Sequence, residues 1–377
     1  MARILIPAYL RDIHATAVAA ALRVKGHEPV VWHGTDFPTR QVSSLFLGDD
    51  GVGRWEVSGP ELEISSAKPF DTVWFRRPVI EPVLPEDMHA GDRAVAHREC
   101  REHSKGIWHF VAREAFWVNP LGTRNRSMIK SLQLSEAASL GLKIPPTLFS
   151  NDPMQIRHFL RTFPGETIYK PFLAALWKAE DTASYLFTSL VTIDDLPDDE
   201  VLRLTPGIFQ TRIPKAYELR VTCLGNLTVS AKLLSQDDAS SALDWRAAFT
   251  RLPLEPIEIS PELDRLCHRL MEKLGLVFGC FDFVVTPEGD HFFLEVNEMG
   301  QFLWIEEINP DIRLLDPFCE FLIQGRPDFT WSPSSSSLRY LDFRDDALRR
   351  QEEHDAHVHL EKPFPQMVDD GAAPVAR

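Results

Sequence analysis

The chain opens with apolar and polar positions arranged as in a β-α-β unit. The first strand pattern is the apolar run RILIPAYL at residues 3–10, and the second is EPVVW at 28–32. Between them, DIHATAVAAALRVK has helical periodicity and stops at Gly26. The unit lacks G-x-G-x-x-G, so the pattern predicts an open α/β domain without a dinucleotide-binding loop.

Further elements follow from the same periodicities. DTVWFRRP at 71–78 predicts a strand that ends in two arginines and a proline, and residues 85–116 predict a long helix. Farther along, the pattern predicts helices ending at Gly141, over 261–275 and over 310–324, and strands at 166–172, 207–236 and 281–297, with Gly225-Asn226 as a two-residue hairpin turn.

The character of the chain changes after Gly325. WSPSSSS is typical of a linker, and the segment from 338 to 377 is rich in charged residues. We expect at most one helix in this charged tail, and a disordered end.

Composition places the chain among ordinary globular proteins. Of its 377 residues, 44% are hydrophobic and 25% are charged, and the formal net charge is −15. An acidic surface repels phosphates, so we expect no nucleic-acid partner, although a local basic pocket for a nucleotide stays open.

Cysteine usage and the N-terminus indicate the compartment. The 5 cysteines are scattered without a C-x-x-C pair, which is typical of reduced, buried thiols in the cytoplasm. The N-terminal apolar run is too short for a signal peptide, and no run approaches the ~18 residues of a membrane helix. We therefore expect a cytoplasmic protein without a membrane partner.

The clearest chemical pattern is the hairpin DFVVTPEGDHFFLEVN at residues 282–297. Side chains alternate between the two faces of a strand. Closing the turn over Pro-Glu-Gly-Asp puts Asp282 directly opposite Glu295, with Asn297 farther along the same face. This register also puts Phe293 on the face of Glu295.

Two carboxylates opposed in a sheet repel each other, and partial burial makes this worse unless a cation lies between them. Asp282, Glu295 and Asn297 offer hard oxygen ligands, which suit Mg²⁺ in a site shared with phosphates. The alternative is a solvated, acidic sheet face.

Cationic side chains upstream could hold those phosphates. Lys170 lies in the strand IYKPF, where a lysine either extends to solvent or meets an anion. Lys130 begins a helix and is unremarkable by itself. Arg220 shares a strand face with Glu218, so a salt-bridged exterior is the alternative there. The predicted two-residue turn puts Lys232 on the other face from Arg220.

Several short pieces occur in a telling order: WFRRP, NRSMIKSLQLSEAASLGLKIPPTLFSND, KAYELRV, DWR at 244–246, GCFDFVV and LEVNEMGQFLWIE. Together they resemble the ATP-grasp ligases, and in particular the microviridin-type peptide maturases, or graspetide ligases. The resemblance spans residues 1–325, so the tail lies beyond it. It departs from the family at Thr211, where an acidic residue is usual, and at Glu298, where proline is common.

The resemblance implies an α+β fold of the ATP-grasp type, in which an N-terminal α/β pre-ATP-grasp domain precedes two α+β lobes that clamp ATP. We expect the division to be 1–117 for the N-terminal domain, 118–205 for the central lobe, 206–330 for the C-terminal lobe with the Mg²⁺ site, and 331–377 for the charged, partly disordered tail.

The resemblance also implies roles for individual residues. Arg220 would be the catalytic cation that faces the γ-phosphate of ATP or an acyl phosphate. Nucleotide-binding roles fall on Lys130 and Lys170 at the phosphates, Gln210 near the adenine, and Glu218 and Lys232. The implied Mg²⁺ ligands agree with the register argument, and they are Asp282, Glu295 and Asn297.

The implied activity is carboxylate activation with ATP and Mg²⁺ as cofactors. An acyl phosphate forms on an Asp or Glu side chain of a ribosomal precursor peptide. A Thr, Ser or Lys side chain of the same peptide then attacks it and gives a macrolactone or macrolactam. A leader segment of the precursor would dock near 173–200, and the resemblance makes a homodimer the expected assembly.

Two other functions stay open. An ATP-grasp amino-acid ligase would act on a small molecule or a protein C-terminus, and the absence of a neighbouring gene for a short acidic peptide would favour it. A non-catalytic nucleotide-binding module would release no ADP with any peptide.

Two histidine-containing clusters complete the candidates. HDAHVH places His354, His357 and His359 near the C-terminus, where three histidines could bind Zn²⁺. On a flexible charged tail we expect a chance cluster instead. His97, Cys100 and His103 fall at helical spacing, for which packing or surface exposure is the expected role.

Overall fold

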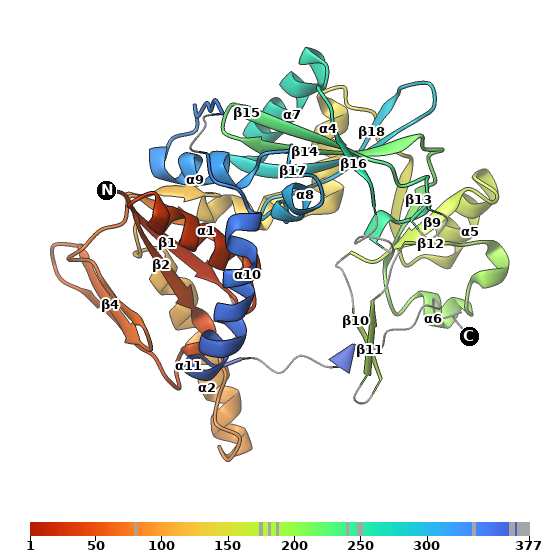
Figure 1. The fold of residues 1–377 in the computed structure, drawn as a ribbon. Coiled ribbons are helices and arrows are strands. Elements are labelled where there is room, and N and C mark those ends of the chain that lie inside the picture. Colours follow the sequence, from red (N-terminus) through yellow and green to blue (C-terminus); the bar gives the residue numbers. More distant parts are fainter. Residues whose placement is uncertain are drawn as a thin grey trace.

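The computed structural model describes residues 1–78, 81–172, 188–238, 241–246, 252–333 and 337–361, and the short strands β10 (Leu176–Ala179), β11 (Thr182–Tyr185) and β19 (Gln366–Met367). Residues 173–175, 180–181 and 186–187, within the expected leader dock, and the end of the tail after 367 therefore lie outside the described residues. Figure 1 shows an N-terminal unit and a smaller unit around β9 and β13, joined through a sheet that carries β14 and β17.

A parallel sheet is the centre of the N-terminal unit. Its order is β2-β1-β6-β7, and its strands are β1 (Arg3–Ala8), β2 (Glu28–His33), β6 (Thr72–Trp74) and β7 (Phe116–Val118). Helix α1 (Ile13–Val24) connects β1 to β2 and begins at Asp12, whose side chain accepts a hydrogen bond from the Ala15 amide. The predicted β-α-β opening is confirmed.

Other parts of the N-terminal unit were predicted less well. The helix expected over 85–116 is α2 and spans Ala90–Trp108. Residues 42–65, for which no element was predicted, form an antiparallel sheet of β3 (Val42–Leu47), β4 (Gly53–Gly59) and β5 (Leu62–Ser65). The short elements are η1 (Gly34–Asp36), η2 (Leu121–Thr123) and α3 (Arg124–Ser127).

The smaller unit is an antiparallel sheet with one main helix. Its order is β12-β9-β13-β8, and its strands are β8 (Thr147–Ser150), β9 (Thr167–Lys170), β12 (Ser189–Leu190) and β13 (Gly207–Thr211). Helix α5 (Pro153–Thr162) packs Ile156 and Leu160 against Phe209. The short elements η3 (Ile193–Asp195) and α6 (Asp199–Leu202) follow β12.

A five-stranded antiparallel sheet joins the units. Its order is β16-β15-β14-β17-β18, and its strands are β14 (Tyr217–Leu224), β15 (Leu227–Leu233), β16 (Leu254–Pro256), β17 (Phe278–Val285) and β18 (His291–Asn297). Helices α4 (Lys130–Ser139) and α7 (Pro261–Leu274) bury their apolar sides against one face of this sheet. Leu224 pairs with Leu227, so the two-residue turn at Gly225-Asn226 is confirmed.

The hairpin of β17 and β18 has the predicted carboxylate pair but a different route to it. Near the turn, Val285 pairs with His291, which is one position out of the predicted register. A β-bulge between Phe293 and Glu295 restores the alignment, and Asp282 pairs with Glu295 as predicted. The bulge also turns Phe293 into the core, where it is fully buried, so its predicted place beside Glu295 is wrong.

The C-terminal part is helical and folds back on the N-terminal unit. The helix expected over 310–324 is two helices, α8 (Leu303–Ile308) and α9 (Leu315–Gln324). Beyond them, α10 (Leu341–Arg350), the π-helical η5 (Gln351–Asp355) and α11 (Ala356–Val358) run on continuously. Figure 1 shows α10 beside α1.

Packing explains why this charged segment is ordered. Tyr340, Phe343 and Ala347 recur at helical spacing and are buried in the same core cluster as α1. The expected single helix is thus one continuous helical run, which packs into the core, and the expected disordered end lies outside the described residues. Within the described residues, no helix is long and apolar enough to cross a membrane.

Candidate active site

A row of four charged side chains crosses the five-stranded sheet. Arg220 on β14 is the cross-strand partner of Asp282 on β17, which is the partner of Glu295 on β18. Arg220 donates from Nη1 to both Asp282 oxygens at 2.6 Å. At the other end, Lys130 Nζ lies 3.1 Å from Glu295 Oε2. Each carboxylate therefore has its own cation, which offsets the repulsion between the two.

The three residues predicted as metal ligands lie together. Asn297 donates from Nδ2 to Asp282 Oδ2 at 3.0 Å and reaches Glu295 Oε1 at 3.5 Å. Two carboxylates and an amide on one face of a hairpin make a compact set of hard oxygen donors. Such a set fits Mg²⁺, which binds one or two carboxylates and completes its shell with water and phosphate oxygens.

The two carboxylates have different proton affinities. Burial raises the pKa of Asp282 above its usual value, even against the attraction of Arg220. Burial acts on Glu295 in the same direction, but the attraction and hydrogen bond of Lys130, with help from Lys170, bring its pKa below the usual value. Glu295 is therefore the more firmly ionised of the pair.

The smaller sheet contributes Lys170 and Gln210 from adjacent strands. Lys170 Nζ donates to Gln210 Oε1 at 2.9 Å, and Gln210 Nε2 donates to Thr147 Oγ1 at 2.9 Å. Burial lowers the pKa of Lys170, and the charge of Glu295 partly opposes this effect. The influence of Glu295 on Lys170 means that the two sheets face each other at this site.

Glu218 lies close to the row, and Lys232 lies apart from it. Glu218 is two residues before Arg220 on β14, is buried, and accepts from Lys215 Nζ at 2.6 Å. Burial raises the pKa of its carboxyl group. Lys232 pairs with Leu219 on the opposite sheet face and donates to Glu255 at 3.2 Å. The structure thus does not bring Lys232 to the other candidates.

An ion pair that was not predicted from the sequence faces the row. Arg246 donates to Asp244 from Nε at 2.8 Å and from Nη2 at 2.5 Å. Burial disfavours the Asp244 carboxylate, but the Arg246 hydrogen bonds outweigh it and lower the pKa of Asp244 to about 2. The hydrogen bond to Asp244 raises the pKa of Arg246, and the charges of Glu295 and Asp282 raise it further, so the pair lies within electrostatic reach of the row. The DWR motif at 244–246 is the part of the sequence from which this ion pair could have been predicted.

The first arginine of WFRRP supports the loop that follows β18. Arg76 is buried, lies 2.8 Å from Asp12 Oδ2 through Nε, and donates from Nη1 to the carbonyls of Met299 and Gly300. The neighbouring carbonyl of Gln301 accepts from Arg220 Nη2 at 3.0 Å. The N-terminal unit thus positions the loop that holds Arg220, a link between distant segments that no local pattern predicted.

A cavity of about 250 Å³ opens beside this loop. Gln301 forms part of its lining, with Tyr9 and His14 from the N-terminal unit and Tyr340 and Arg344 from the C-terminal segment. The cavity shares Gln301 with the contacts of Arg220, so it provides space next to the charged row. Its walls come from three separate parts of the chain.

Comparison with known proteins matches this geometry to one family. Residues 3–125 match the family model of the MvdD pre-ATP grasp domain. The macrocyclase MdnB from Microcystis aeruginosa MRC is 30% identical, with 85% of this chain and 99% of that chain covered at a TM-score of 0.70. No curated protein sequence matches the chain.

Two further structures extend the likeness. The macrocyclase MdnC from the same organism, solved with the precursor peptide MdnA, is 27% identical over 85% of this chain and 99% of that chain, with a TM-score of 0.74. The Chryseobacterium gregarium RiPP-associated ATP-grasp ligase, solved with ADP and a leader and core peptide, covers 87% of this chain and 98% of its own at a TM-score of 0.78. It is 24% identical, so it supports the fold alone.

Proposed function

The chain belongs to the ATP-grasp macrocyclases that include MdnB, and on that premise we propose that it joins side chains within a ribosomal precursor peptide. An Asp or Glu side chain of the peptide is activated as an acyl phosphate at the expense of ATP. A Thr, Ser or Lys side chain of the same peptide then attacks, and an ester or amide closes the ring. The observation that carries this proposal is the charged row of Arg220, Asp282, Glu295 and Lys130, with Asn297 beside it.

The cations of the site are suited to hold the triphosphate. Lys130 and Lys170 both act on Glu295 electrostatically, Lys130 from helix α4 on the five-stranded sheet and Lys170 from β9 of the smaller sheet, so they converge on one place. Lys170 is also held toward Gln210, which we assign to the adenine side of the nucleotide. A bound phosphate would give Lys170 the anion that its burial calls for.

Arg220 is the candidate for stabilising negative charge on the transferred phosphoryl group and on the tetrahedral intermediate. Its guanidinium is fixed by Asp282 and by the Gln301 carbonyl, so it needs no reorganisation when charge develops. Mg²⁺ on Asp282, Glu295 and Asn297 would supply charge neutralisation at the phosphate oxygens. We also assign a nucleotide-binding role to Glu218 on β14, whose carboxylate accepts a hydrogen bond from Lys215.

The cavity beside Gln301 is suited to receive part of the peptide. It adjoins Arg220 through the Gln301 carbonyl and has both apolar and charged walls. A peptide side chain placed there would approach the acyl phosphate from the N-terminal unit. We place the leader segment near residues 173–200, of which β12 (Ser189–Leu190) lies at the edge of the smaller unit.

Three further assignments belong to this proposal. The domain boundaries are 1–117, 118–205 and 206–330, with residues 337–361 added to the N-terminal unit because they pack on α1. A cytoplasmic location suits the free cysteines, all five of which are unpaired in the structure. The homodimer rests on the family resemblance, and light scattering coupled to gel filtration tests it.

The direct test is mass spectrometry of the cognate precursor peptide after incubation with the protein, ATP and Mg²⁺. Each bond formed removes one water, so the mass falls in steps of one water with matching release of ADP. Glu295→Gln should reduce the rate by about 100-fold or more, because loss of an outer-shell partner of a metal ligand alone costs about 10–100-fold. Glu255→Gln is the matched control, because Glu255 is an exposed glutamate on β16, at the other edge of the same sheet.

Loss of water from a free amino acid or a protein C-terminus instead of the peptide would replace this proposal with the amino-acid ligase alternative. Normal turnover of Glu295→Gln with Mg²⁺ and ATP would contradict the metal assignment.

A further inference from the structure

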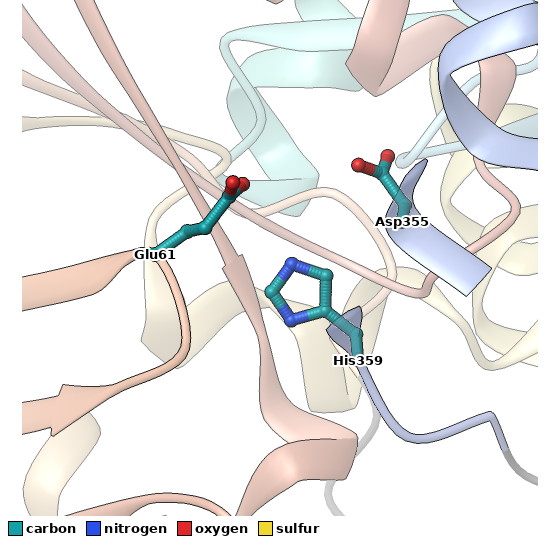
Figure 2. A group of neighbouring side chains, drawn as sticks. All are labelled: Glu61, Asp355 and His359. Atoms are coloured by element: carbon teal, nitrogen blue, oxygen red, sulfur yellow. The ribbon is translucent and has the colours of Figure 1, made fainter. Parts of the chain in front are cut away.

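A second cluster of metal-ligating side chains lies far along the chain from the charged row. Figure 2 shows Glu61, from the turn between β4 and β5, facing Asp355 and His359 of the C-terminal segment. One ligand atom from each of the three residues lies within 4.8 Å of the others. The histidine motif near the C-terminus is thus part of a folded cluster rather than of a flexible tail.

His359 is held so that one ring nitrogen faces the two carboxylates. Its side chain is buried, and Nδ1 lies 2.7 Å from Asp36 Oδ2. The Leu360 amide donates to Asp36 Oδ1 at 2.8 Å and fixes that carboxylate in turn. When Nδ1 carries the proton and donates it in a hydrogen bond to Asp36, Nε2 presents its lone pair to the gap between Glu61 and Asp355 (Figure 2). A carboxylate behind a histidine is the usual outer support of a metal-ligating imidazole.

Asp355 supplies an independent observation. The residue is 3% exposed, and its Oδ1 receives no hydrogen bond although it is buried. The nearest positive group is Arg350, whose Nε lies 3.1 Å away without the alignment of a hydrogen bond. A buried carboxylate oxygen in this position calls for a better cationic partner.

Arg350 stands in the place that such a cation would take. Its Nη2 donates to Glu61 Oε2 at 2.9 Å, and its side chain is 43% exposed, so it can move to solvent. His354 Nε2 lies 2.6 Å from Glu61 Oε1 and helps to hold that carboxylate beside the cluster. Tetrahedral coordination at about 2.1 Å needs ligand atoms about 3.5 Å apart, so atoms that now lie within 4.8 Å of one another have to approach by at most about 1.3 Å.

We propose that Glu61, Asp355 and His359 form a binding site for a first-row divalent cation of the Zn²⁺ type. The mixed nitrogen and oxygen donors favour Zn²⁺ over Mg²⁺, which prefers oxygen ligands throughout. The bound ion fastens the C-terminal segment, through Asp355 and His359, to the turn between β4 and β5 of the N-terminal unit, through Glu61. The segment contributes Tyr340 and Arg344 to the cavity beside the active site, so the ion also braces one wall of that cavity.

The test is Zn²⁺ binding to the full chain, freed of metal with EDTA and measured without nucleotide by competition with a chromophoric chelator. A Glu295→Gln background removes binding at the charged row from the measurement. In that background, we expect one Zn²⁺ equivalent that Glu61→Gln and His359→Gln lose and that His357→Gln keeps, because His357 is exposed and outside the cluster. Co²⁺ at the site should show the strong visible absorption of tetrahedral coordination.

Stability and Arg350 give two further readouts. Saturating Zn²⁺ should raise Tm by about 2 °C or more in the parent and not in Glu61→Gln. Arg350→Met should bind Zn²⁺ more tightly, since it removes the competing cation, and a loss of binding there would overturn the placement. If Glu61→Gln binds as many Zn²⁺ ions per chain as His357→Gln, the proposed site is wrong. This comparison holds even if His359→Gln disturbs the fold, because Glu61 is exposed and its substitution leaves the core intact.

Discussion

Replacing Arg220 by methionine should expose the electrostatic design of the charged row. The Arg220 side chain is 4% exposed and that of Asp282 14%, so the pair belongs with buried ion pairs. Methionine keeps most of the side-chain volume but leaves the Asp282 carboxylate beside Glu295 without its cation. Breaking a buried pair from one side costs about 3–5 kcal/mol, because the remaining charge is uncompensated. We expect Arg220→Met to lower the free energy of unfolding by this amount at pH 7.5.

A double-mutant cycle isolates the pair from its surroundings. Urea unfolding, followed by tryptophan fluorescence in EDTA, gives the free energy of unfolding for the parent, Arg220→Met, Asp282→Asn and the double variant. We expect a coupling energy of about 2–3 kcal/mol. The double variant should be more stable than Arg220→Met, since it no longer buries an unpaired carboxylate.

The pH dependence of Arg220→Met has a definite sign. Burial already raises the pKa of Asp282 in the folded protein, and removal of Arg220 raises it further. The folded state then binds a proton that the unfolded state has released, so stability falls as pH rises from the unfolded pKa of about 3.9 through the folded one. The deficit of Arg220→Met should therefore be smaller at pH 5 than at pH 7.5. A deficit below about 1 kcal/mol with no coupling would refute the view of the row as a buried, mutually compensated set.

Two other predictions test neighbouring features. Lys170→Ala should raise the apparent KM for ATP about tenfold or more in an ADP-release assay, because it removes one charged hydrogen bond. Lys232→Ala, on the opposite sheet face, should leave this KM unchanged. Equal effects of the two substitutions would contradict the assignment of Lys170. Burial lowers the pKa of His14 to about 3, so below pH 6.5 the unfolded chain binds a proton that the folded chain does not. The free energy of unfolding should therefore fall by about 2 kcal/mol on going to pH 5. His14→Gln should lack this loss in thermal unfolding, and an equal loss in the variant would exclude His14 as its source.

The sequence predicted the parts of the fold that depend on local periodicity. The β-α-β opening, the turn at Gly225-Asn226 and the amphipathic helix α7 each have a pattern that is complete within a few residues. The packing of the C-terminal segment could not be predicted, for the opposite reason. Its apolar positions are few and widely spaced among charges, and only their burial against α1 shows that they suffice.

The candidate site divides in the same way. Arg220, Asp282, Glu295 and Asn297 lie on adjacent strands, so strand pairing predicts their meeting. Lys170 and Arg246 reach the row only because separate segments fold over it, and no spacing in the sequence specifies such an approach.

The carboxylate hairpin shows how a correct prediction can rest on an incomplete argument. Strict alternation of side chains from a turn with an even number of residues pairs Asp282 with Glu295, and the structure has the same pair. The turn in the structure holds one more residue than predicted, and the bulge before Glu295 takes up the difference. Without the bulge, the longer turn would pair Asp282 with Leu294 and send Glu295 to the apolar face. The bulge therefore does two things at once, because it buries Phe293 against Phe283 and returns Glu295 to the polar face.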